Sequence, residues 1–108
     1  MITLRPEFEH RDSRRTLTQL FTRDIKQVNF YKIKKGAVLG RHYHKYTTEY
    51  FYVISGTLRY NEEFNIATGD LFYIPIGITH SFRVLTRTLL MTFLDKPFSK
   101  EEPDLWKE

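Results

Sequence analysis

The chain contains no cysteine. This absence excludes a disulfide framework, a thiolate metal site and a thiol nucleophile, and it fits a reducing compartment. The first dozen residues are polar, unlike a signal peptide, and no apolar run approaches the roughly 18 residues that a membrane-spanning helix needs. Together these absences predict a cytoplasmic protein that makes no contact with a membrane.

The chain is rich in aromatic residues, which make up 16% of it, while hydrophobic residues as a whole make up 41%. This is ample apolar surface for one core, and much of it belongs to Phe and Tyr. A length of 108 residues suits one domain and is too short for two.

The net charge is +4, and much of the excess lies near the start of the chain, at Arg5, Arg11, Arg14, Arg15, Arg23 and Lys26. Such a cluster can attract the phosphate of a nucleic acid or of a nucleotide-linked metabolite, or it can be a solvated basic face. The basic residues are not interleaved with aromatics, and there is no helix-turn-helix or zinc-finger pattern. We therefore do not expect nucleic acid as a partner.

Short strands are predicted along almost the whole stretch 27–94. Segments such as QVNFYKIKK, TEYFYVIS and TLLMTFL combine apolar, β-branched and aromatic residues, and turn signals such as ATGD and PIGIT separate them. TLRY and EFNI flank Asn61-Glu62 as a hairpin would. The pattern predicts an all-β antiparallel sandwich or barrel with no long helix. Six residues are expected to line or close its interior: Phe51, Val53, Leu71, Tyr73, Phe82 and Val84.

The predicted organisation is an N-terminal extension with an edge strand (1–26), a barrel (27–94) and a charged C-terminal tail (95–108). The tail holds the single tryptophan, Trp106. It can cover the barrel of its own chain or pack across a dimer partner.

The stretch GRHYHKYTTEYFYVISG places polar residues next to a predicted core strand. His42 and His44 are two residues apart, so on a strand both point to one face, and Glu49 can enter the next strand facing the same interior. Two imidazoles and a carboxylate form a 2-His-1-carboxylate set, and His80 can join it after the PIGIT loop. Burial of these four residues together indicates a divalent ion, and the alternative is a hydrogen-bonded polar cluster in a metal-free barrel. His10 is given no role.

Two motifs in these segments resemble those of the cupin superfamily. The first runs from Gly36 through the His42-Tyr43-His44 triplet and Glu49 to Gly56, and the second from Gly69 through PIG to His80, where only the final asparagine is replaced, by Val84. The resemblance implies a jelly-roll barrel of six to eight strands that is often dimeric. It also implies a divalent ion on His42, His44, Glu49 and His80, which suits Zn, Mn, Fe and Ni alike.

A weaker similarity links residues 12–45 to cupins that act on nucleotide-linked keto sugars, including deoxyhexose 3,5-epimerases. The matching residues are Asp12, Arg14, Gln27, Asn29, Gly36, Gly40, His42 and Tyr43. In the epimerases the histidine that matches His42 is a catalytic base and a tyrosine further along supplies the acid, but no tyrosine follows Tyr73 here.

Three hypotheses for the function follow. The first is an isomerase or epimerase of a small carbohydrate-like metabolite, which can be anionic or nucleotide-linked. In this hypothesis the metal is a Lewis acid, and the catalytic candidates are Glu49, His42, Arg41 and Tyr73. The second is a metal-dependent dioxygenase, and the third is a metabolite sensor without chemistry. A homodimer is expected, with Tyr31 and Trp106 as contact residues.

Overall fold

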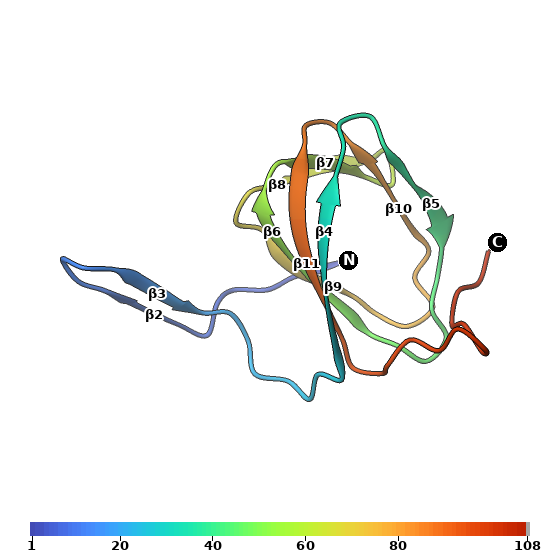
Figure 1. Cartoon of the computed structure of the whole chain (residues 1–108), viewed down its shortest axis with the longest axis horizontal. Helices are drawn as coiled ribbons and strands as arrows, with labels where there is room; N and C mark the ends of the chain where they lie inside the picture. The colour runs from blue at the N-terminus through green and yellow to red at the C-terminus, as the bar shows by residue number, and fades with distance from the viewer. Residues whose placement is uncertain (108) are drawn as a thin grey trace.

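The computed structural model describes residues 1–107, which form eleven strands and no helix. A five-stranded antiparallel sheet has the order β1-β9-β6-β11-β4, and a four-stranded one has the order β5-β10-β7-β8 (Figure 1). The bounds in the first sheet are β1 Ile2–Thr3, β9 Leu71–Ile74, β6 Glu49–Ser55, β11 Thr88–Leu94 and β4 Gln27–Ile33. In the second they are β5 Val38–His42, β10 His80–Val84, β7 Thr57–Tyr60 and β8 Phe64–Ala67. Within the described residues no helix is long and apolar enough to cross a membrane.

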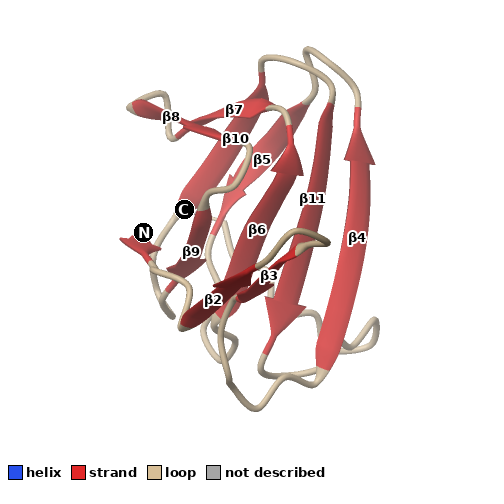
Figure 2. Ribbon diagram, turned by 90° about the vertical axis from the view of Figure 1, so that its left-hand side faces the viewer, coloured by secondary structure: helices blue, strands red, loops and turns tan. Residues whose placement is uncertain are grey.

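The two sheets pack face to face and bury one core between them (Figure 2). Alternate residues of each strand point inward, as the two-residue period of a strand requires. Phe51 and Val53 of β6 meet Phe82 and Val84 of β10 in this core, and all four are less than 5% exposed. The predicted all-β jelly-roll domain is confirmed.

On β9 the predicted inward residues are wrong by one position. Phe72 and Ile74 belong to the core, whereas Tyr73 lies on the outer face of the sheet, 5.4 Å from the ring of Tyr50. Leu71 shares that outer face, although it is buried. The sequence LFYI is apolar or aromatic at every position, so it contains no alternation that would set the phase of the strand.

Two tight connections fix the register of the sheets. Asn61 and Glu62 both adopt positive φ, 49° and 56°, in the predicted hairpin between β7 and β8. Gly56, with φ of 113°, separates β6 from β7. A Cβ at Gly56 would clash with the Thr88 hydroxyl at the start of β11, so only glycine fits at this position.

The N-terminal region contributes one strand to the barrel and one separate hairpin. β1 pairs with β9 at the edge of the five-stranded sheet. The hairpin of β2 (Phe8–Arg11) and β3 (Thr16–Gln19) pairs only with itself and stands away from the barrel (Figure 1). It carries much of the basic charge described above.

Candidate metal centre

A β-bulge turns His42 into the interior. β5 and β10 pair His80 with His42 and Phe82 with Leu39, so β5 contains one more residue than β10 between these pairs. The extra residue at Gly40-Arg41 bends the strand, as bulges do, and it lets both Leu39 and His42 face inward. Arg41 is exposed and does not line the interior cavity.

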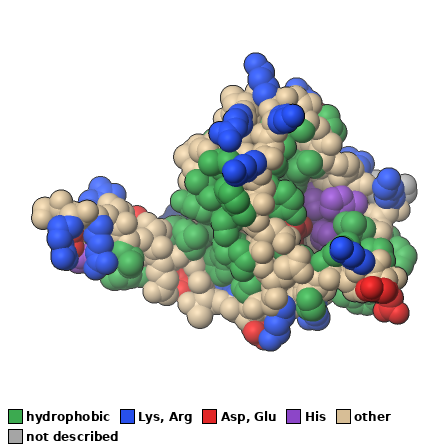
Figure 3. Space-filling view, in the orientation of Figure 1, with side chains coloured by type: hydrophobic (Ala, Val, Ile, Leu, Met, Phe, Trp, Pro, Cys, Tyr) green, Lys and Arg blue, Asp and Glu red, His purple; other side chains and the backbone are tan. Residues whose placement is uncertain are grey.

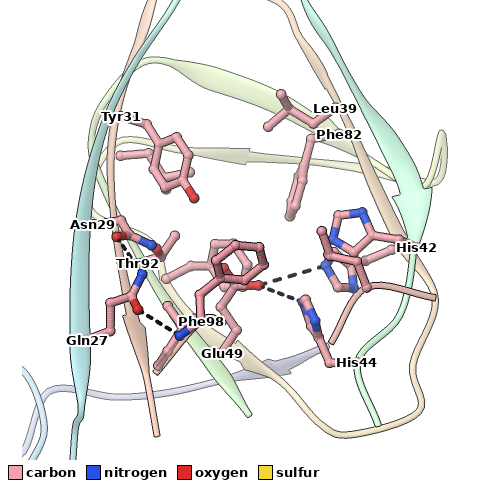
Figure 4. Close-up of a pocket in the computed structure, with 15 residues that line it drawn as sticks. Gln27, Asn29, Tyr31, Leu39, His42, His44, Glu49, Phe82, Thr92 and Phe98 are labelled. Carbon is pink, nitrogen blue, oxygen red and sulfur yellow. Dashed lines mark hydrogen bonds and ion pairs between the residues drawn. The ribbon is translucent and has the colours of Figure 1, made fainter. Parts of the chain in front are cut away.

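Four side chains from three parts of the fold converge beside the core. His42 ends β5, His44 follows it, Glu49 begins β6 and His80 begins β10 (Figure 4). The three histidines offer ring nitrogens that all lie within 4.8 Å of one another. Oε1 of Glu49 is 3.3 Å from Nε2 of His44 and 3.9 Å from Nε2 of His80. The structure therefore brings together all four residues that the sequence suggests as ligands.

Each histidine is oriented by a backbone carbonyl. Nδ1 of His42 lies 3.0 Å from the oxygen of Gly40, and Nδ1 of His80 lies 3.1 Å from that of Ile78. Nδ1 of His44 lies 2.6 Å from the oxygen of Asp104. Because a carbonyl only accepts, the proton of each neutral ring is on Nδ1, and the lone pair of Nε2 is left for the centre. This is the usual arrangement of metal-binding histidines.

The electrostatics of the centre favour neutral rings at two positions. Burial lowers the pKa of His80 to about 4, and burial together with the nearby His44 lowers the pKa of His42. Burial also disfavours the charged form of His44, but the hydrogen bonds to Glu49 and to the Asp104 carbonyl outweigh it and raise the pKa of His44. The 3.3 Å contact between Nε2 of His44 and Oε1 of Glu49 thus marks a position beside which a cation can bind.

These observations fit a divalent ion of the kind the motifs imply. Three nitrogen lone pairs and one carboxylate oxygen share one side of a cavity, and the proton-carrying nitrogens point away from it. Nitrogen and oxygen ligands in this proportion suit Zn and other first-row transition metals. The residues that would hold the ion are His42, His44, Glu49 and His80.

The C-terminal tail forms a clamp over the segment that carries His44. The Asp104 carboxylate accepts hydrogen bonds from the backbone N–H groups of residues 45, 46 and 47, at 2.8, 2.9 and 3.0 Å. Trp106 pairs with Tyr43 through two backbone hydrogen bonds, and the ammonium of Lys45 lies 3.6 Å from the centre of the Trp106 ring. The tail therefore packs on its own barrel, the first of the two alternatives for it.

The loop before His80 is held by the turn of a different hairpin. Oδ1 of Asn61 accepts a hydrogen bond from the backbone N–H of Ser81 at 2.7 Å, and its Nδ2 donates to the carbonyl of Thr79 at 3.2 Å. These contacts bracket His80 on both sides. Sequence reasoning missed the roles of Asn61 and Asp104, because neither belongs to a ligand motif and each is distant along the chain from the histidine it supports.

The four candidate ligands form one wall of a cavity of about 350 Å³. The cavity lies between β4 and β5, and Figure 3 shows histidine side chains from outside in a hollow on this face. Apolar side chains line most of it, with Phe98 and Leu105 of the tail among them, and its lining contains no lysine or arginine. Tyr31 lines the cavity. Tyr73 does not, because it faces outward from β9.

The structure shows a two-sheet barrel with three histidines and a glutamate clustered inside it, and comparison with family models gives the family. The model of the cupin domain matches residues 29–95, well over half of the chain. The chain therefore belongs to the cupin family. None of the curated proteins gave a significant match.

Solved structures share this fold. The capsular polysaccharide assembling protein CapF from Staphylococcus aureus is 24% identical, with a TM-score of 0.65 over 93% of this chain and 33% of its own. CapF with the inhibitor 3-isopropenyl-tropolone gives 27% identity and a TM-score of 0.63 over the same shares of the two chains. The present chain thus spans a third of the length of CapF.

A relative of similar size is the TDP-quinovose 3,4-ketoisomerase WlaRB from Campylobacter jejuni. It is 16% identical, with a TM-score of 0.74 over 94% of this chain and 88% of its own. At this identity the likeness establishes the shared fold.

Proposed function

We propose that the protein is a metal-dependent cupin that isomerises or epimerises a small carbohydrate-like metabolite. The observation that carries the proposal is the convergence of three histidine ring nitrogens and the Glu49 carboxylate on one wall of a largely apolar cavity. A bound divalent ion would supply a Lewis acid that polarises a carbonyl group and stabilises an enediolate. Fold similarity to a sugar ketoisomerase supports this class of reaction.

Residues that line the cavity are candidates for the proton transfers of the reaction. Glu49 is the only carboxylate among the residues that line it, so it is the candidate to move a proton from a carbon next to the carbonyl. Tyr31 points its hydroxyl group into the cavity from the opposite wall (Figure 4) and replaces Tyr73 as the candidate acid. The aromatic and aliphatic lining offers an apolar surface to the carbon skeleton of a ligand.

The experiment has two stages. Metal content of the protein as isolated is measured by mass spectrometry, and the metal-loaded protein is then incubated in D₂O with TDP-linked keto sugars and small keto acids. Isomerisation predicts deuterium on the carbon next to the carbonyl, detected by NMR. Oxygen consumption with iron would instead identify a dioxygenase, and binding without exchange would identify a sensor.

We propose further that the protein is a homodimer, joined through the outer face of the five-stranded sheet. Val28 and Phe30 of the edge strand β4 are 53% and 52% exposed on this face, and Figure 3 shows hydrophobic side chains over β4 and β11. Phe21 of the same chain stacks on Tyr50 and packs edge to face against Phe93, and so covers part of this face. The part around Phe30 offers an apolar surface to a second copy of the chain.

The projecting hairpin of β2 and β3 also favours a dimer. Phe8 and Leu17 are 53% and 42% exposed on one face of a two-stranded unit, and such a unit is marginally stable by itself. The two residues predicted from sequence as dimer contacts have other neighbours, because Tyr31 lines the cavity and Trp106 packs under Lys45.

A further inference from the structure

Thr92 is a buried hydroxyl without a hydrogen-bond partner. It lies on β11, is 1% exposed and lines the cavity, and its Oγ1 is the one buried side-chain polar atom of residues 1–107 that lacks a partner. Thr88, on the same strand and the same face, is equally buried, but its hydroxyl donates to the carbonyl of Thr86 at 2.9 Å. A buried hydroxyl without a hydrogen-bond partner lowers the stability of the folded state, so the unpaired Oγ1 of Thr92 needs an explanation.

Asn29 stands directly across from Thr92. The two residues are cross-strand partners in the β4–β11 ladder, and both face the cavity. Oδ1 of Asn29 accepts a hydrogen bond from Nε2 of Gln27 at 3.0 Å, and Oε1 of Gln27 accepts one from the backbone N–H of Phe98 at 2.8 Å. This chain of bonds fixes the amide of Asn29 with its NH₂ group as the remaining donor.

The polar pair lies on the wall opposite the histidines. Figure 4 shows Gln27, Asn29 and Thr92 on one side of the cavity, His42 and His44 on the other, and the rings of Phe82 and Phe98 between them. The two polar walls are thus separated by an apolar middle. Among residues 1–107, no lysine or arginine lines the cavity, so an anionic ligand would meet no permanent positive charge there besides a metal ion.

We infer that Thr92 and Asn29 form a second binding subsite, which receives a hydroxyl or carbonyl oxygen at the far end of a ligand whose near end binds the metal. The inference rests on the proposed metal centre and deepens it. The ligand class is a compact molecule with a metal-binding oxygen at one end, an apolar face in the middle and a neutral oxygen at the other end. A phosphate or nucleotide group, where a ligand has one, lies outside the cavity.

The test uses tropolone, a flat ring with two adjacent oxygens that chelate divalent metals, and its 4- and 5-hydroxy derivatives, which add a hydroxyl group away from the chelating end. Binding to the zinc-loaded protein is measured by calorimetry. The better hydroxy derivative should bind wild type roughly 3- to 10-fold more tightly than tropolone, as one neutral hydrogen bond allows. This preference should vanish in Thr92→Val and survive in Thr92→Ser and in the matched control Thr88→Val.

A second readout separates a binding role from a structural one. In the metal-free protein, Thr92→Val should melt at the same temperature as wild type or higher, because it replaces an unpaired hydroxyl with a methyl group, whereas Thr88→Val should melt lower. An unchanged preference in Thr92→Val, or no preference in zinc-loaded wild type, would overturn the subsite and leave the metal centre intact. If the wild-type protein retains no metal, this result would contradict both the subsite and the metal centre.

Discussion

The carbonyl oxygen of Asp104 accepts a hydrogen bond from Nδ1 of His44 at 2.6 Å, across 60 residues of sequence. The side chain of the same aspartate holds the backbone of residues 45–47. One residue of the tail therefore fixes both the position of the His44 segment and the tautomer of its ring. Partners of this kind tune a metal site without touching the metal.

Replacing Asp104 should weaken metal binding without removing a ligand. In Asp104→Ala the three hydrogen bonds to residues 45–47 are lost, so the carbonyl that orients His44 is no longer held in place. We expect the affinity for zinc to fall about 10- to 100-fold, measured by competition with a chromophoric chelator. Glu101→Ala, in the same tail but exposed, is the control, and equal affinities of the two variants would contradict the role of Asp104.

Removal of two ligands should abolish metal binding and leave the fold. His42→Ala with His44→Ala removes two of the four candidate ligands, while the apolar core stays intact. Metal content should fall to background, the β-type circular dichroism should persist, and the stabilisation by added zinc should vanish. His10→Ala, on the projecting hairpin, should behave as wild type. Equal metal content in wild type and the double variant would place the ion elsewhere.

The metal-free protein should lose stability in mild acid. Burial holds the pKa of His80 at about 4 in the folded state, against 6.5 for a free histidine, so between these values the unfolded chain binds a proton that the folded chain does not. Stability should therefore decline as the pH falls below about 6.5 and level off near 4, by up to about 3 kcal/mol. His42, whose pKa is also lowered, adds to this decline, whereas His44, whose pKa is raised, works in the opposite direction.

Urea unfolding at a series of pH values, with a chelator present, measures this decline. His80→Gln should reduce the pH dependence in the same window, because the group with the largest shift is gone, while His42 keeps part of the decline. His10→Gln should leave it unchanged. A wild-type stability that is constant from pH 7 to pH 4 would contradict the buried, neutral state of His80.

The proposed dimer should depend on the exposed outer face of β4. Phe30→Glu places a charge in the middle of this apolar surface, and burial of an unpaired charge at an interface is costly. We expect wild type to sediment as a dimer at micromolar concentration and Phe30→Glu as a monomer. Val38→Glu is the control, because Val38 is 68% exposed on β5, in the other sheet. A monomeric wild type would refute the proposal.

The sequence predicts the ligand wall well and the opposite wall poorly. His42, His44, Glu49 and His80 stand at fixed spacings around glycine turns, so the spacing identifies them as one set, while a bulge and the tail orient His42 and His44. The two-residue period predicts Tyr73 inside the barrel, but LFYI has no alternation, and only the pairing of β9 with its neighbours decides which residues face inward. Asn29 and Thr92 become partners through the β4–β11 ladder, a pairing across more than half of the chain.

The clamp around Asp104 also separates the barrel from the completion of its centre. All eleven strands end before the tail begins, so the two sheets contain none of its residues. The orientation of His44, in contrast, depends on residues 104–106 lying against the barrel. A chain truncated before Asp104 is therefore expected to keep every strand and to lack the contacts that hold His44 in place.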